Sequence, residues 1–202
     1  MNASATVLAK QPAATAKASV ARRSAQPLPS PAVLRQRLPL SDALAARIRN
    51  DRDAIRAVLD GHDPRLLVVV GPCSLHDPVA ALEYAERLAA LVHEVSDQLL
   101  LVMRTYVEKP RTTIGWKGLV YDPHLDGSGN MADGLHLSRR LMLDILETGL
   151  PIASELLQPL AAGYFDDLLG WAAIGARTSE SQIHRELVSG LDLPVGFKNG
   201  TD

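Results

Sequence analysis

The most constraining feature of this 202-residue sequence is a set of five short apolar runs between residues 66 and 197. The first, Leu66–Val70, is continuous and rich in β-branched residues, which is typical of a strand buried on both faces. Stretches with helical signals separate most of the runs, and alternating strands and helices predict a parallel sheet. An open doubly wound sheet and a (β/α) barrel both fit this pattern. The other four runs occupy residues 99–103, 151–154, 172–176 and 193–197.

Helical signals lie before and between the runs. Residues 41–60 carry apolar residues at helical spacing, and Ser41 or Asp42 can cap the start of this helix. Asp77-Pro78 begins a second helix with a long apolar stripe. Residues 105–130, with several Gly and Pro, are expected to form a long loop. Three further helices are expected at residues 135–146, 164–169 and 179–188.

Charge and composition divide the chain into three parts. Residues 1–40 contain six basic residues and no Asp or Glu. Residues 1–30, rich in Ala, Ser and Pro, are expected to be a disordered basic tail, with an organelle transit peptide as the alternative. Residues 31–65 then form an N-terminal extension with a helix, and residues 66–202 form the barrel-like part.

Composition excludes several classes of protein. No apolar run approaches the roughly 18 residues of a membrane-spanning helix, so no membrane partner is expected. The net charge of -2 is too balanced for a nucleic-acid binder. The single cysteine rules out an intramolecular disulfide and favours a reducing compartment, the cytoplasm.

Each apolar run leads into a residue that can bind an anion or a metal. In a barrel, all strands end on one face, where the active site is built, so these residues would converge there. A charge after a single strand is often only a solvated strand end, but five in register favour an anion site for two phosphates, or a phosphate and a carboxylate. The residues concerned are Cys73, Arg104, Glu155, Arg177 and Lys198, with Lys109 and Arg111 just beyond Arg104.

Cys73 has three interpretations: a small buried apolar residue, a soft metal ligand, or a nucleophile with His76 as its base. The six histidines have no zinc-site spacing, and no nucleotide-binding motif is present. The Gly-rich residues 127–134 follow no strand and are expected to be a plain loop.

Four motifs resemble the type I 3-deoxy-D-arabino-heptulosonate-7-phosphate (DAHP) synthases, and the resemblance covers about residues 28–202. The related 3-deoxy-octulosonate-8-phosphate synthases share the Gly-Pro-Cys start in some members but match the second motif less well. The motifs are residues 71–77 (Gly-Pro-Cys-Ser-Leu-His-Asp), 109–118 (Lys-Pro-Arg-Thr-Thr, then Gly-Trp-Lys-Gly), 175–178 (Gly-Ala-Arg-Thr) and 196–202 (Gly-Phe-Lys-Asn-Gly-Thr-Asp).

The resemblance implies a (β/α)8 TIM barrel with an N-terminal extension, of which about the first five strands are present. It implies a transferase that condenses phosphoenolpyruvate (PEP) with erythrose 4-phosphate, releases phosphate and begins the shikimate pathway to the aromatic amino acids. A divalent metal ion (Mn, Fe, Co or Zn) is the implied cofactor.

The resemblance also assigns roles to individual residues. Arg104 and Lys109 are implied as catalytic and PEP-binding cations, together with Arg177 and Lys198. Glu155, Gly175 and Ala176 line the same pocket, Arg111 and Thr112 match the part that holds the erythrose phosphate, and Cys73 matches one metal ligand.

The other implied metal ligands, a His, a Glu and an Asp, have no match in these 202 residues. The chain is therefore expected to be a truncated form that is inactive alone. The alternatives are a non-catalytic interaction module or half of a split enzyme, and an unrelated phosphate-binding (β/α) protein. Family members are commonly homo-oligomers, and many respond to an aromatic amino acid effector, whose expected region here is residues 156–164.

Overall fold

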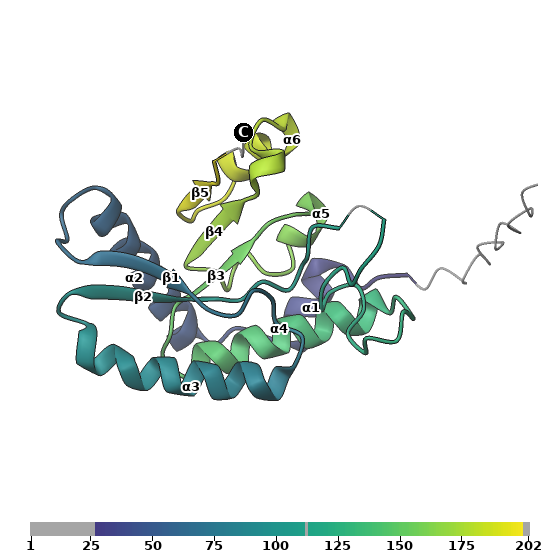
Figure 1. Ribbon diagram of the computed structural model, residues 1–202, viewed down its shortest axis with the longest axis horizontal. Coiled ribbons are helices and arrows are strands. Elements are labelled where there is room, and N and C mark those ends of the chain that lie inside the picture. Colours follow the sequence, from purple (N-terminus) through teal and green to yellow (C-terminus); the bar gives the residue numbers. More distant parts are fainter. Residues whose placement is uncertain (1–26, 112, 200–202) are drawn as a thin grey trace, which may run out of the picture.

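Five parallel strands form a sheet that curls into half of a barrel (Figure 1). The computed structural model describes residues 27–111 and 113–199. The strands pair in chain order, with Leu66 opposite Leu99 in the first pair. This arrangement confirms the predicted α/β fold as a partial TIM barrel. The strands are β1 (Leu66–Val70), β2 (Leu99–Arg104), β3 (Ile152–Glu155), β4 (Trp171–Ile174) and β5 (Val195–Phe197).

Six α-helices and one 3-10 helix accompany the strands in the described residues. The N-caps predicted for the two long helices before β2 are confirmed: Ser41 accepts from the amide of Leu44, and Asp77 accepts from Val79 and Ala80. None of the described helices is long and apolar enough to cross a membrane. The helices are α1 (Pro31–Arg37), α2 (Asp42–Leu59), α3 (Pro78–Val95), α4 (Met131–Glu147), α5 (Pro159–Ala162), η1 (Ala176–Thr178) and α6 (Gln182–Ser189).

Two sequence expectations are wrong. The stretch 127–134 is not all loop, because α4 begins at Met131 and Gly134 lies in its first turn, where a Cβ would lie 2.7 Å from Leu119 O. Residues 164–168 form turns, and the regular helix is the earlier α5. Arg139 binds Tyr164 O, a carbonyl that a helix over these residues would use, and Arg52 binds Asp166 O and Leu169 O.

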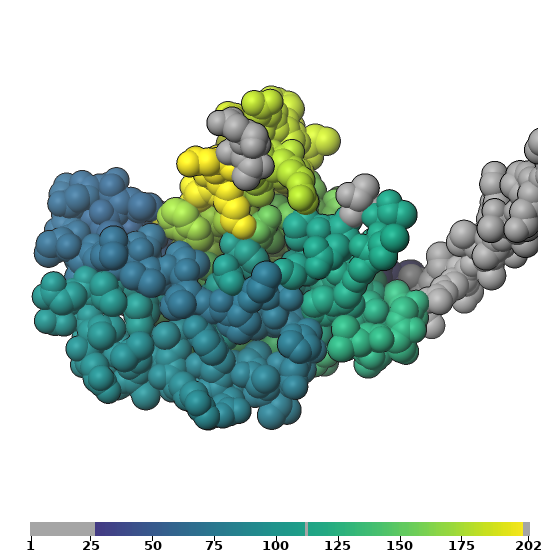
Figure 2. All heavy atoms as spheres, in the orientation of Figure 1, coloured from purple at the N-terminus to yellow at the C-terminus, as the bar shows by residue number. Residues whose placement is uncertain are grey.

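The core has two parts because strand side chains alternate between the faces of the sheet. Leu101 and Met103 of β2 belong to the large core, which also contains buried side chains of α3 and α4. Val102, between them, joins Ala153 and Ile55 of α2 in a small cluster on the other face. Figure 1 shows α3 and α4 on one side of β1 and β2, while β4, β5 and α6 curve away on the other side, and the yellow C-terminal segment stands at the top of the surface in Figure 2.

Helix α2 is anchored beside the N-terminal ends of β4 and β5. Arg52 donates to Leu169 O at 2.9 Å and to Asp192 O at 3.0 Å, and these residues precede the two strands. The opposite ends of the strands are therefore left for a functional site.

The proposed tail mostly lies outside the described residues, since residues 1–26 are not among them. Ser30 caps α1, and Pro29 O accepts a hydrogen bond from the Tyr164 hydroxyl. The end of the proposed tail, residues 27–30, therefore contacts the segment after α5.

Candidate active site

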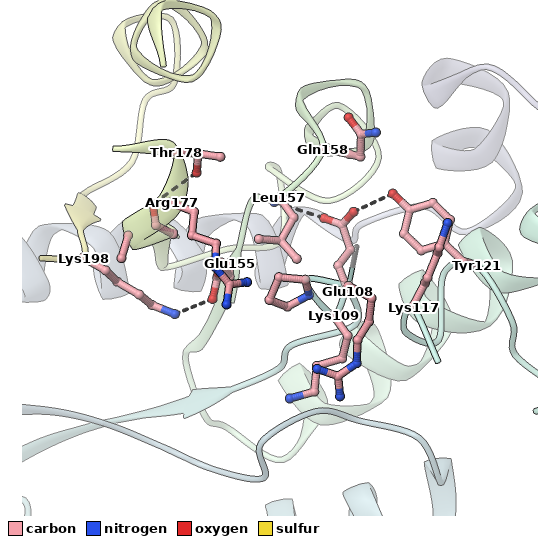
Figure 3. Close-up of a pocket in the computed structure, with 14 residues that line it drawn as sticks. Glu108, Lys109, Lys117, Tyr121, Glu155, Leu157, Gln158, Arg177, Thr178 and Lys198 are labelled. Atoms are coloured by element: carbon pink, nitrogen blue, oxygen red, sulfur yellow. Dashed lines mark hydrogen bonds and ion pairs between the residues drawn. The ribbon is translucent and has the colours of Figure 1, made fainter. Parts of the chain in front are cut away.

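A cavity of about 670 Å³ lies at the C-terminal ends of the strands, between the segments that follow β2, β3, β4 and β5 (Figure 3). Five cationic and two anionic side chains line it, which leaves a formal excess of three positive charges. Of the residues predicted for the site, those lining the cavity are Lys109, Arg111, Glu155, Gly175, Ala176, Arg177 and Lys198.

Glu155 and Lys198 form an ion pair at one side of this cavity (Figure 3). Glu155 ends β3 and is buried, whereas Lys198 follows β5 and is partly exposed. Burial disfavours the charge of Lys198, but its hydrogen bond to Glu155 and the nearby Tyr106 outweigh burial, so the pKa of Lys198 is raised. Gly175 leaves room for this pair, because a Cβ there would lie 2.7 Å from Glu155 Oε1.

Lys109 lies where the segments after β1 and β2 meet. Its Nζ donates to Cys73 O at 3.1 Å and to Cys73 Sγ at 2.6 Å. This contact, with the charge of Lys109, lowers the pKa of the exposed Cys73 thiol. The His76 ring instead lies edge-on to Trp116, with 6.4 Å between the ring centroids, so the contacts give no support to His76 as a base for Cys73.

Arg104 binds the backbone of the residues that follow β1. Its Nε and Nη2 donate to Pro72 O and Gly71 O at 2.9 and 2.8 Å, and its guanidinium lies over the Tyr106 ring. Arg104 is not among the residues that line the cavity. Thr112, the remaining predicted substrate contact, lies outside the described residues.

The long loop after β2 folds back on itself beside the cavity. Lys109 N donates to Lys117 O, and Val120 N donates to Val107 O. Gly118 permits this close approach: its φ is +112°, and a Cβ would lie 2.7 Å from the Cα of Glu108.

The same loop places residues in the site that the sequence reasoning missed. Pro110, Lys117 and Thr178 stood in recognised motifs but had no assigned role, and Glu108 adjoins Lys109. For the others no sequence signal existed, since their placement depends on how the loops fold. The missed residues are Glu108, Pro110, Lys117 and Tyr121 in this loop, with Leu157 and Gln158 after β3 and Thr178 after β4.

The described residues do not form a metal site by themselves. Among residues 27–111 and 113–199, no group of three or more His, Cys, Asp or Glu could hold an ion. Cys73 can supply one thiolate, whereas a catalytic metal ion usually needs about three protein ligands.

The comparison with protein families agrees with the four motifs. The profile described as the DAHP synthetase I family matches residues 42–202 of this chain.

The chain belongs to the DAHP synthetase I family.

Relatives in this family match most of the chain. The Tyr-sensitive phospho-2-dehydro-3-deoxyheptonate aldolase of Escherichia coli is 57% identical over 177 residues, which are 88% of this chain and 50% of that protein. The Trp-sensitive enzyme of Enterobacter agglomerans is 57% identical over 164 residues, 81% of this chain and 47% of that protein.

A solved family structure supports the fold. Phospho-2-dehydro-3-deoxyheptonate aldolase from Francisella tularensis has a TM-score of 0.86 and 48% identity, over 89% of this chain and 53% of that one. The chain thus spans about half the length of the curated relatives it matches.

Proposed function

We propose that these residues form the PEP-binding part of a DAHP synthase, which condenses PEP with erythrose 4-phosphate to give DAHP and phosphate. This reaction is the first step of the shikimate pathway. The observation that carries the proposal is the convergence of Lys109, Arg177 and Lys198 on one cavity beside Glu155. The family membership of residues 42–202 supports the same reaction.

The charge of the cavity suits PEP, which carries a phosphate and a carboxylate. Arg177 offers a planar fork for either oxyanion, and Lys109 and Lys198 act as point charges. Glu155 holds the Lys198 ammonium in place before substrate arrives, so little reorganisation is needed when the anion binds.

In the proposed reaction, the PEP methylene carbon attacks the aldehyde carbon of erythrose 4-phosphate. Positive character then develops at the enol-ether carbon of PEP, water adds there, and the carbon–oxygen bond breaks as phosphate leaves. The cations hold the phosphate and carboxylate in attack geometry throughout. We propose that Arg111, which lines the same cavity, binds the phosphate of erythrose 4-phosphate.

Cys73 is the described residue that we propose as a ligand of a divalent ion (Mn, Fe, Co or Zn). We expect no phosphate release from the 202-residue chain, because no three metal-ligating side chains come together among the described residues. Phosphate release from PEP, erythrose 4-phosphate and Mn²⁺ tests this expectation, and turnover by the purified chain would contradict it.

Calorimetric titration of the chain with PEP tests the site itself. We expect saturable binding that Arg177→Ala weakens about tenfold or more, because a charge-assisted pair is lost. Arg140→Ala removes an exposed guanidinium on α4, outside the cavity, and is the matched control. Equal PEP affinity in the parent and Arg177→Ala, or no binding to the parent, would contradict the proposal.

Regulation, assembly and location follow the same proposal. Relatives are named Tyr-, Phe- and Trp-sensitive, so an aromatic amino acid is the proposed class of effector. We propose a homo-oligomer, and the cytoplasm as the location, because a reducing compartment keeps the exposed Cys73 as a thiol.

A further inference from the structure

A continuous line of hydrogen bonds crosses three segments at the rim of the cavity. In the loop after β2, the Tyr121 hydroxyl donates to Glu108 Oε1 at 2.8 Å. Leu157 N, after β3, donates to Glu108 Oε2 at 3.3 Å (Figure 3). His184 Nε2, on α6, lies 3.0 Å from Leu157 O, and its Nδ1 lies 2.8 Å from Ser181 Oγ.

The chemistry of the partners sets the direction of each hydrogen bond. A carbonyl oxygen can only accept, so His184 Nε2 carries a proton, and in the neutral ring Nδ1 accepts from the Ser181 hydroxyl. Burial raises the pKa of Tyr121, and the Glu108 charge raises it further, so its hydroxyl stays protonated and donates.

Burial and hydrogen bonding shift the pKa of Glu108 in opposite directions. It is only 4% exposed, and burial raises its pKa. The Tyr121 hydroxyl and the amides of Leu157 and Gln158 oppose that rise, because they hydrogen-bond to the carboxylate. Each of these donors would lose its partner if the side chain left its position.

The backbone of Leu157 is therefore held from both sides, by the loop after β2 through its N–H and by α6 through its C=O. Leu157 comes two residues after Glu155, which pairs with Lys198, and Glu108 comes immediately before Lys109. The line of hydrogen bonds thus joins the segment that carries Lys109 to the segment that carries Glu155, the ion-pair partner of Lys198.

We propose that Glu108 and His184 are positioning residues that hold the backbone of Leu157. By doing so they fix Lys109 relative to the Glu155–Lys198 pair in the anion site. The proposal rests on PEP being the ligand of that site. Neither residue needs to touch PEP for this role, and His184 is not among the residues that line the cavity.

Three variants separate positioning from simple core packing. His184→Phe keeps a planar ring but removes the donor, and His184→Gln restores a donor near the position of Nε2. His93→Phe, at an exposed histidine of α3, is the matched control. Calorimetry with PEP gives the affinity of each variant, and circular dichroism melting gives its stability.

We expect His184→Phe to weaken PEP binding about tenfold, which corresponds to one hydrogen bond lost against a buried acceptor. His184→Gln should recover most of that affinity, and His93→Phe should match the parent. A purely structural role would lower the melting temperature of His184→Phe and leave PEP affinity unchanged. Parent-like PEP affinity in His184→Phe would therefore overturn the proposal.

Amide hydrogen exchange at Leu157 provides a readout without ligand. Glu108→Gln leaves one uncharged oxygen to accept from both Leu157 N and the Tyr121 hydroxyl, so we expect faster exchange at Leu157 than in the parent. If the parent chain fails to bind PEP, the proposed function is overturned. Amide exchange at Leu157 then still tests whether Glu108 and His184 hold the backbone of Leu157. Unchanged exchange in both Glu108→Gln and His184→Phe would overturn those contacts.

Discussion

Asp51 lies in the middle of α2, and its Oδ2 is buried with no hydrogen-bond partner among the described residues. Burial raises the pKa of Asp51 from 3.8 to about 6, and the charge of Arg47, one turn earlier, only partly offsets the rise. The folded state therefore binds this proton more tightly than the unfolded state does. Ionisation of Asp51 consequently lowers the free energy of unfolding.

We expect Asp51→Asn to stabilise the protein at pH 7.5. A rise of about two pKa units corresponds to about 3 kcal/mol, and solvent screening of this half-buried carboxyl reduces the value to about 1–2 kcal/mol. With a urea m-value of about 2 kcal/mol/M, the unfolding midpoint should rise by about 0.5–1 M. The loss of unfolding free energy caused by ionised Asp51 is complete above pH 6. It becomes smaller as Asp51 is protonated in the folded state below pH 6, and it is absent below pH 3.8.

Urea unfolding followed by circular dichroism, at pH 7.5 and pH 4, measures this effect. Asp53→Asn is the matched control, because Asp53 lies on the same helix but its side chain is 71% exposed. We expect a clear gain for Asp51→Asn at pH 7.5, most of which is lost at pH 4. An equal shift of the midpoint at both pH values, or a lower midpoint at pH 7.5, would refute the reasoning.

Three further substitutions test the packing, each by its urea midpoint. Gly134→Ala places a Cβ against the backbone of Val120, so we expect a loss of about 3 kcal/mol; Gly190→Ala, whose nearest contact would be an ordinary 3.5 Å, should cost much less. Arg139→Met removes the donor to Leu38 O and Tyr164 O and one of the two arginines paired with Asp167, and should cost about 3–5 kcal/mol; a change below about 1 kcal/mol would contradict this. Ser41→Ala removes the α2 cap and should cost about 1 kcal/mol; an unchanged midpoint would count against the cap.

Much of the framework could be predicted because its signals are local. Ser41 and Asp77 cap helices through bonds that span two or three residues, and Leu66–Val70 forms a strand by its own composition. The placement of Glu155 and Lys198 at the same edge was also predictable, since all parallel strands of one sheet end at the same edge.

The remaining features depend on contacts between residues far apart in the sequence. Residues 164–169 have an apolar pattern that suits a helix, but arginines more than 20 residues away bind their carbonyls. Tyr121 lines the cavity because Gly118 lets the loop after β2 fold tightly against Glu108. No local sequence pattern predicts this close approach of Gly118 to Glu108.

The anchoring of α2 through Arg52 also bears on how the chain folds as it is synthesised. Arg52 is made early, but the carbonyls it binds belong to Asp166, Leu169 and Asp192, between 114 and 140 residues later. At about 5–20 residues per second, translation separates these groups by on the order of ten seconds. During that interval Arg52 lacks these carbonyl partners and α2 is not yet anchored, so a nascent chain stalled before residue 166 should be a substrate for ribosome-associated chaperones.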